Sequence, residues 1–342
     1  MIKSVHFKNF KVLQNVVLPL SPFTLIVGPN GSGKTTAMQA LQMARTPKHY
    51  AFSQVVTAGV QYDIDAVVEI KIDWHVDNTE FIGKVTWLRA PRSIDLVYGP
   101  TYSWVAGEDW SEKYAAFANE QLKNFKIFAF DAKAISAPVT LHSNLELQPD
   151  GTNLAGVLDN IRDVDPERFE ELNNELGRWL PEFDRILFES PLEGKRALML
   201  RTRIGKHRIR ASELSQGTLF ALAFLTLAYL PQPPSIVCFE EAEHGIHPRL
   251  LVEIRDAMYR LCYPKDYGEK RDPVQVIATT HSPYLLDLYK DHPEEIVIAN
   301  KDAQGIQFER LSEKPDISEF LQDAPLSEVW YSGVLGGVPL KP

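Results

Sequence analysis

The sequence predicts an α/β fold with a mixed core sheet, an antiparallel β layer and a small helical lobe. Apolar runs at 23–27, 235–241 and 274–280 alternate with helical segments, which is typical of a parallel core sheet. Residues 60–105 alternate apolar and polar side chains in short runs between turn residues, a pattern that indicates an antiparallel sheet. Residues 152–180 change to helical spacing and predict the helical lobe.

Composition limits the class of protein. A chain of 342 residues has room for about two globular domains. Its 36 basic and 45 acidic residues give a net charge of -9, so any nucleic-acid contact is confined to a patch. Two cysteines cannot form a disulfide framework, and the first ten residues hold no apolar signal segment, so we expect a cytoplasmic protein. The apolar run 219–230 is too short for a membrane span and predicts a buried helix, and we expect no membrane contact.

Residues 28–35 read GPNGSGKT and satisfy the pattern G-x-x-x-x-G-K-[ST] between an apolar strand and a helix. In such a loop the backbone N–H groups surround phosphates, Lys34 reaches the β- and γ-phosphates, and the Thr35 hydroxyl can bind Mg²⁺. The alternative is a chance glycine-rich turn, which the flanking strand and helix disfavour. The residues of this region expected to bind the nucleotide are Gly28, Asn30, Gly31, Ser32, Gly33, Lys34, Thr35 and Thr36.

The second apolar run ends in two carboxylates, Glu240 and Glu241. Adjacent side chains of a strand point in different directions, so Glu240 can hold the Mg²⁺ shell while Glu241 faces an attacking water as general base. The alternative interpretation is an ordinary charged strand end, and the presence of a phosphate-loop motif in the same chain argues against it. Cys238, within the same run, is interpreted as a small buried hydrophobe.

Two further motifs follow the pattern of a nucleotide site. His281 comes directly after a predicted strand, where it can reach the γ-phosphate or orient the water, and the alternative is a structural histidine. Residues 214–218, LSQGT, open the apolar helix. Ser215 suits a helix N-cap. Alternatively, Ser215, Gln216 and Gly217 bind a γ-phosphate that a second molecule presents.

These four motifs, in this order, resemble those of the ABC-type ATPases, with LSQGT at the place of the LSGGQ signature. FKNF near the start, GPNGSGKTT, the acid pair followed by AEHGIHP, and TTHSP are most similar to the branch with RecF, the SMC heads and the ATPase half of OLD-family nucleases. The resemblance implies a P-loop ABC-ATPase head that uses ATP and Mg²⁺. It also implies a homodimer with composite ATP sites. Glu240 stands where ABC proteins usually have Asp, and Gln148 is a weak candidate for the Q-loop glutamine.

The resemblance also implies how the chain is divided. A nucleotide-binding lobe is expected over 1–140 and 213–300, and a helical lobe with a basic hairpin over 141–212. Residues 301–342 are expected to form a C-terminal extension, and its final residues, GVLGGVPLKP at 333–342, hold glycines and prolines that predict a weakly ordered tail.

Compact OLD-like ATPases often serve prokaryotic anti-phage systems, so the resemblance implies an ATPase that regulates a separately encoded effector, a nuclease or a toxin. About 180 residues separate Lys34 from Ser215, too few for long coiled-coil arms, and no TOPRIM-like acidic cluster follows His281. Two alternatives stay open: a RecF-like DNA-repair clamp that binds DNA, and an ATP-sensing scaffold with little turnover.

A basic segment precedes the signature. Residues 195–210 hold seven Lys or Arg and no acid, on a predicted hairpin that can contact phosphates or an acidic partner. The alternative, a solvated hairpin face, is favoured. Trp and Tyr at 98–110 can stack on bases, but without interleaved Lys or Arg they fit a core or a protein interface better. The arginines expected to project as pairs are Arg201 with Arg203 and Arg208 with Arg210.

Overall fold

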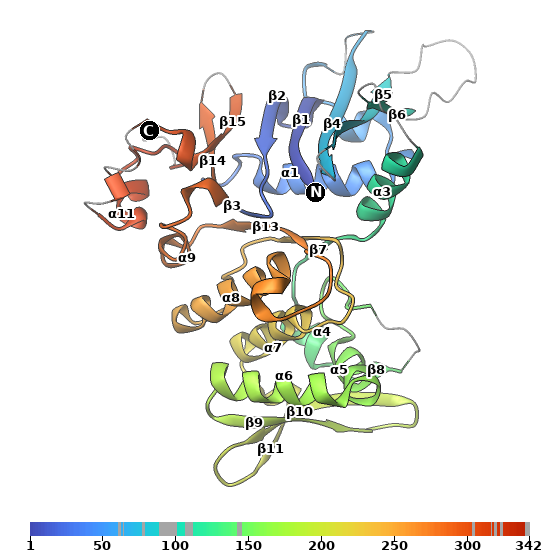
Figure 1. Cartoon of the computed structure of the whole chain (residues 1–342), viewed down its shortest axis with the longest axis vertical. Helices are drawn as coiled ribbons and strands as arrows, with labels where there is room; N and C mark the ends of the chain where they lie inside the picture. Colours follow the sequence, from blue (N-terminus) through green and yellow to red (C-terminus); the bar gives the residue numbers. More distant parts are fainter. Residues whose placement is uncertain are drawn as a thin grey trace. The chain divides into compact units, whose positions relative to one another are not determined.

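The chain divides into two compact units in a computed structural model (Figure 1). The first unit comprises residues 1–126, 234–242 and 274–342, and the second comprises 127–233 and 243–273. The aromatic stretch 98–110 lies outside the described residues except for the backbone of 101–106. The structure describes residues 1–60, 63, 65–76, 79–88, 101–106, 112–141, 146–302, 305–315, 317, 320–321 and 324–338.

Five strands of a six-stranded sheet form the core of the first unit; the sheet order is β15-β14-β3-β13-β12-β7, and β7 crosses the boundary between the units at residue 126. Strands β14, β3, β13 and β12 run parallel, which confirms the predicted parallel core, and β15 is antiparallel to β14. Every residue of β3, β12 and β13 is buried, as expected of strands covered on both faces. The bounds are β3 (Phe23–Val27), β7 (Phe125–Phe128), β12 (Ile236–Phe239), β13 (Gln275–Thr280), β14 (Ile296–Asp302) and β15 (Gly305–Arg310).

A five-stranded antiparallel sheet, in the order β2-β1-β4-β5-β6, makes the predicted β layer. Trp74 of this sheet stacks on Phe81 and meets the ring edge of Phe117, so the helix α3 packs against the sheet through aromatic side chains. The bounds are β1 (Ile2–Phe10), β2 (Leu13–Pro19), β4 (Val67–Val76), β5 (Thr79–Leu88), β6 (Thr101–Ala106), α1 (Lys34–Arg45), η1 (Pro47–His49), α2 (Phe52–Val55) and α3 (Glu112–Lys123).

Residues 326–338 pack onto the first unit, so the predicted weakly ordered tail is packed as far as residue 338, and its residues 339–342 lie outside the described part of the chain. Leu326 and Leu335 are buried, and the indole Nε1 of Trp330 donates a hydrogen bond to the carbonyl oxygen of Gly337 at 3.1 Å. The glycines of this segment make tight turns with positive φ, so they direct the chain back onto β14. The remaining elements of the first unit are α9 (Pro283–Asp287), η6 (Pro293–Glu295), η7 (Leu311–Glu313) and α11 (Leu326–Tyr331).

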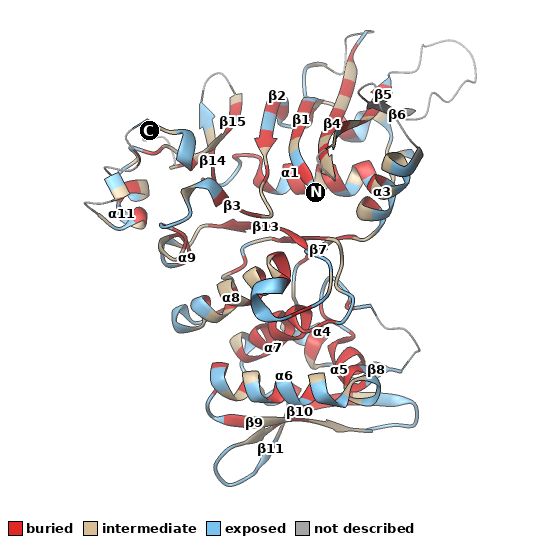
Figure 2. Ribbon diagram, viewed as in Figure 1, coloured by how far each residue is buried: buried red, intermediate tan, exposed pale blue. Residues whose placement is uncertain are grey.

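The second unit combines helices with a small sheet. Strand β10 pairs antiparallel with β9, β11 and β8. The apolar helix α7 is buried along nearly its whole length, as the sequence predicts (Figure 2). The bounds are α4 (Ala132–Ser136), β8 (Val139–Thr140), α5 (Leu154–Val164), α6 (Pro166–Trp179), β9 (Phe183–Glu189), β10 (Lys195–Thr202), β11 (Arg208–Arg210), η3 (Ala211–Glu213), α7 (Gln216–Ala228), η4 (Pro248–Leu250), α8 (Leu251–Cys262) and η5 (Pro264–Tyr267).

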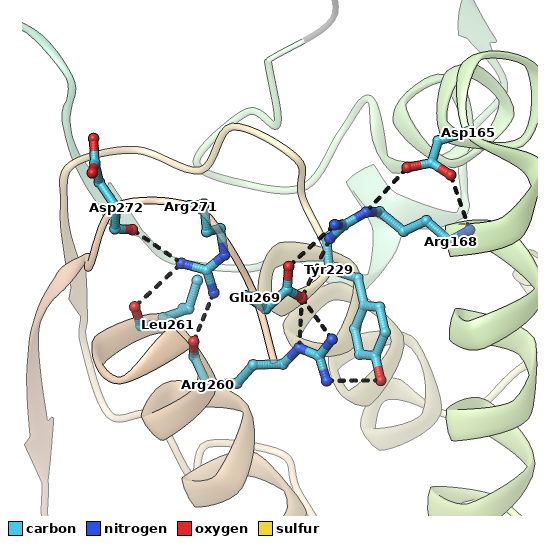
Figure 3. A network of polar contacts seen from close by, with 8 residues as sticks. All are labelled: Asp165, Arg168, Tyr229, Arg260, Leu261, Glu269, Arg271 and Asp272. Atoms are coloured by element: carbon cyan, nitrogen blue, oxygen red, sulfur yellow. Dashed lines mark hydrogen bonds and ion pairs between the residues drawn. The ribbon is translucent and has the colours of Figure 1, made fainter. Parts of the chain in front are cut away.

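One buried carboxylate joins the helices of the second unit (Figure 3). Glu269 accepts hydrogen bonds from Arg168 of α6 at 3.1 Å and from Arg260 of α8 at 2.6 Å. The Arg260 guanidinium also lies 4.0 Å from the ring centre of Tyr229, at the end of α7. Burial alone would raise the pKa of Glu269, but hydrogen bonds and charges from Arg168 and Arg260 outweigh burial and lower this pKa. Glu269 therefore connects α6 to α8.

We predict that Glu269→Ala lowers the free energy of unfolding by about 3 kcal/mol, because it leaves two guanidinium groups without their buried counterion. Urea denaturation at neutral pH measures the loss. The pKa of Glu269 is lower in the folded protein than in the unfolded chain. The ionised carboxylate therefore stabilises the fold at neutral pH, and this stabilisation is lost as the pH falls through the folded-state pKa. The difference in the free energy of unfolding between wild type and Glu269→Ala should therefore become smaller below about pH 4. The exposed Glu193→Ala is the matched control, and an equal loss there would contradict the assignment.

Candidate functional site

The glycine-rich loop joins β3 to α1 at the carboxyl edge of the core sheet. Gly31 and Gly33 have φ values of 76° and 85°, in the left-handed region that glycine tolerates best. A Cβ added to Gly28 would overlap the carbonyl oxygen of Ala299 on β14 and lie 2.9 Å from the Cβ of Ala299. A Cβ added to Gly33 would lie 2.8 Å from the Leu13 side chain. The three glycines are therefore required by the space and the backbone geometry of the loop.

The start of α1 is suited to bind an anion. No side chain caps this end of the helix and no acid lies in its first turn, so its backbone N–H groups retain their partial positive charge. The Ser32 hydroxyl oxygen is buried and has no hydrogen-bond partner among the described residues. Lys34 is nearly buried and its ammonium donates to the carbonyl oxygens of Gly28 at 2.8 Å and Pro29 at 2.9 Å. Asn30 and Thr35 are exposed, and Thr36 is half-buried.

The acid pair lies at the same edge of the sheet, directly after β12. The backbone N–H of Glu241 donates to the Thr279 hydroxyl at 3.0 Å, and that of Ala242 donates to the Thr279 carbonyl oxygen at 3.2 Å. Glu241 has a φ of 47°, a left-handed conformation that costs a residue with a side chain about 1 kcal/mol. Burial raises the pKa of Glu240, and the neighbouring charge of Glu241 raises that pKa further.

His281 follows β13, the strand between β3 and β12. Its Nε2 lies 4.0 Å from a carboxylate oxygen of Glu241, whose side chain is 51% exposed, whereas that of His281 is 31% exposed. The structure therefore places His281 beside Glu241, with both side chains accessible to solvent. Cys238 is fully buried, and burial raises the pKa of its thiol, in keeping with a small hydrophobe.

The signature segment begins α7 in the second unit. Ser215 is the N-cap, and its hydroxyl accepts from the backbone N–H of Thr218 at 3.1 Å. A Cβ on Gly217 would lie 2.9 Å from the carbonyl oxygen of Gly245, which follows the acid pair in the sequence. Only glycine at position 217 therefore allows the start of α7 to lie this close to Gly245. Gln216 packs against Gly245. The weak Q-loop candidate Gln148 is exposed and donates to the carbonyl oxygen of Glu146.

Most of the arginines that the sequence predicts to project from the basic hairpin have hydrogen-bond acceptors within the second unit. Asp184 on β9 binds Arg201 and Lys206, and these two cations lower the pKa of Asp184 to about 2. Arg210 pairs with Glu189 at 3.0 Å. The guanidinium of Arg203 donates to the backbone carbonyl oxygens of Pro181 and Gly177. Arg208 is exposed to solvent. The acids come from the neighbouring strand, so the composition of the hairpin alone does not reveal them.

Some neighbours of the site were missed by sequence reasoning. The carbonyl oxygen of Ala299 and the ammonium of Lys301 flank the glycine-rich loop, and Gly245 contacts the signature. A glycine four residues after an acid pair is a detectable signal, but nothing local connects Lys301 with the loop. No group of three or more His, Cys, Asp or Glu among the described residues is arranged to hold a metal ion. Within the same part of the chain, no helix is both long and apolar enough to cross a membrane.

The parallel sheet and the glycine-rich loop define a P-loop ATPase of the ABC, SMC and OLD-like class. The chain belongs to the family described as "AAA domain, putative AbiEii toxin, Type IV TA system", which matches residues 23–287. A curated relative is the OLD nuclease of Thermus scotoductus, 33% identical over 92 residues. That alignment covers 26% of this chain and 17% of the relative.

Solved structures support the fold. An SMC head bound to the C-winged helix domain of ScpA has a TM-score of 0.60 at 17% identity, covering 93% of this chain and 99% of that one. An SMC head domain from Thermotoga maritima has a TM-score of 0.52 at 15% identity, covering 90% and 98%. These comparisons confirm the predicted ABC-type α/β head fold.

Proposed function

We propose that the protein binds and hydrolyses ATP, closes as a homodimer around the nucleotide, and thereby regulates a separate effector in prokaryotic anti-phage defence. The observation that supports nucleotide binding is the uncapped start of α1, next to the buried Ser32 hydroxyl that has no hydrogen-bond partner among the described residues. Membership in a family of P-loop ATPases supports it.

The residues of the site divide the chemistry between them. The backbone of 31–35 binds phosphate oxygens, and Lys34 leaves its carbonyl partners to neutralise the β- and γ-phosphates. Glu241 accepts the proton of the attacking water, and His281 positions that water or the γ-phosphate. The Thr35 hydroxyl and the Glu240 carboxylate are oxygen ligands of the kind Mg²⁺ prefers, and bound Mg²⁺ would neutralise phosphate charge.

The proposed dimer assigns the signature to the opposite protomer. Ser215 uses its oxygen to cap α7, but a hydroxyl that accepts a hydrogen bond can still donate its own proton to a phosphate oxygen. Ser215, Gln216 and Gly217 of one chain would then contact the γ-phosphate held by the loop of the other. Hydrolysis removes that contact and reopens the dimer.

We expect Lys34→Ala to abolish productive ATP binding, because it removes the buried cation of the loop. Glu241→Gln should bind ATP but reduce turnover by at least about a hundredfold, since it removes the base. Phosphate release and equilibrium binding measure the two effects, and light scattering with ATP should show Glu241→Gln as a stable dimer. Near-wild-type phosphate release by Glu241→Gln would exclude this residue as the base. Lys290→Ala, an exposed lysine on the same unit, is the control for loss of one positive charge.

Composite sites lead to a complementation test. Lys34→Ala and Ser215→Arg should each be inactive, yet a mixture should regain part of the activity, because one site of the heterodimer combines an intact Lys34 with an intact Ser215. The mixed species is isolated with two affinity tags before the assay. An inactive mixed dimer would show that the signature does not act in trans.

The effector is proposed from the comparisons. The family description names a toxin and a toxin–antitoxin system, the curated relative is a nuclease, and a similar SMC head is bound to a domain of another protein. Direct nucleic-acid binding through the hairpin 195–210 is less favourable, because acids of the same unit pair with Arg201, Lys206 and Arg210. We therefore assign the output of the ATPase cycle to a protein partner.

Purified protein without a partner should leave DNA and RNA intact in the presence of ATP and Mg²⁺. Gel analysis of both nucleic acids over a long incubation measures this. Glu241→Gln serves as a matched sample whose nucleotide site is occupied without turnover. Cleavage that persists in Lys34→Ala would reveal a nuclease centre in this chain and would overturn the proposal of a separate effector.

A further inference from the structure

The end of β14 lies alongside the glycine-rich loop. Strand β14 pairs in parallel with β3, with Ile298 opposite Val27, and it continues to Asp302 while β3 ends at the loop. Ala299 closely approaches Gly28. A Cβ built on Gly31 would lie 3.8 Å from the ammonium nitrogen of Lys301. The strand neighbouring β3 therefore brings a second lysine to the phosphate loop.

This second lysine is available for a ligand. Lys301 is exposed, and no carboxylate of the described residues pairs with its ammonium. Lys34, by contrast, is held by two carbonyl oxygens of the loop. A lysine ammonium is a compact charge on a flexible stem, so it can turn toward a phosphate that enters the loop.

The backbone that carries Lys301 is fixed from the other side. The Asn300 side-chain oxygen accepts a hydrogen bond from the backbone N–H of Gly337, and Trp330 donates to the carbonyl oxygen of Gly337. A Cβ on Gly337 would lie 3.6 Å from the Cα of Gly28, so this turn abuts the start of the loop. The segment 330–337 thus keeps Lys301 at a defined place beside the loop.

We propose that Lys301 binds a phosphate of the nucleotide from the side of the loop opposite the acid pair. The strand order β14-β3-β13-β12 places Lys301 on one side of β3 and Glu240 and Glu241 on the other. The anion would then meet Lys34 within the loop and Lys301 at its flank. This inference rests on the proposed ATP binding and adds a residue to it.

The test compares Kd for ATP in wild type, Lys301→Ala, Lys301→Arg and Lys301→Glu, with Lys290→Ala as the control for net charge. We expect about tenfold weaker binding for Lys301→Ala, since a hydrogen bond to a charged group contributes on that order. Lys301→Glu should bind more weakly still, and Lys301→Arg should stay within about threefold of wild type because it keeps the positive charge. Lys290→Ala should not change the Kd.

Two readouts separate contact from structural support. The difference in ATP affinity between wild type and Lys301→Ala should become smaller as the salt concentration rises. The thermal unfolding midpoint of Lys301→Ala without nucleotide should match that of wild type. A Kd within twofold of wild type in both Lys301→Ala and Lys301→Glu would overturn the inference while wild-type ATP binding stands. Absence of ATP binding by wild-type protein would instead overturn the proposed function, and this inference with it.

Discussion

The close approach of Gly28 to the carbonyl oxygen of Ala299 is the constraint on which the candidate nucleotide site depends. It lets β3 run beside β14 to its last residue, so that the loop leaves the sheet at the carboxyl edge. Gly31 and Gly33 then turn the backbone through left-handed conformations, which would cost an L-residue roughly 1–2 kcal/mol each. The shape of the loop is thus fixed by backbone packing.

Parallel strands bring the remaining chemistry to the same edge. Because β12 and β13 follow β3 across the sheet, the residues after both strands meet there, and Glu241 lies beside His281. The left-handed φ of Glu241 is unfavourable, but its N–H and that of Ala242 are both held by Thr279. A left-handed φ at a non-glycine residue costs free energy, and such strained residues cluster at functional sites.

The sequence predicted the parts of this molecule that local patterns encode. Apolar runs marked the buried strands, and the glycine pattern with its lysine marked the loop. The errors have one physical cause, which is pairing between residues distant along the chain. Asp184 on β9 forms an ion pair with Arg201 on β10. The side-chain oxygen of Asn300 accepts a hydrogen bond from the backbone N–H of Gly337, which lies in the segment predicted to be weakly ordered. Lys301 is an ordinary surface lysine in the sequence, and only the pairing of β14 with β3 brings it to the loop.

The acid pair lies close in sequence to the boundary between the two compact units. The chain passes from the first unit to the second between Ala242 and Glu243, one residue after Glu241. Three residues further on, the carbonyl oxygen of Gly245 touches Gly217, next to the N-cap of α7. Four residues of chain and one glycine–glycine contact therefore lie between Glu241 and the signature. If Glu241 acts in the proposed ATPase cycle, relief of its left-handed φ would change the direction of this short connection at the point where the chain enters the second unit.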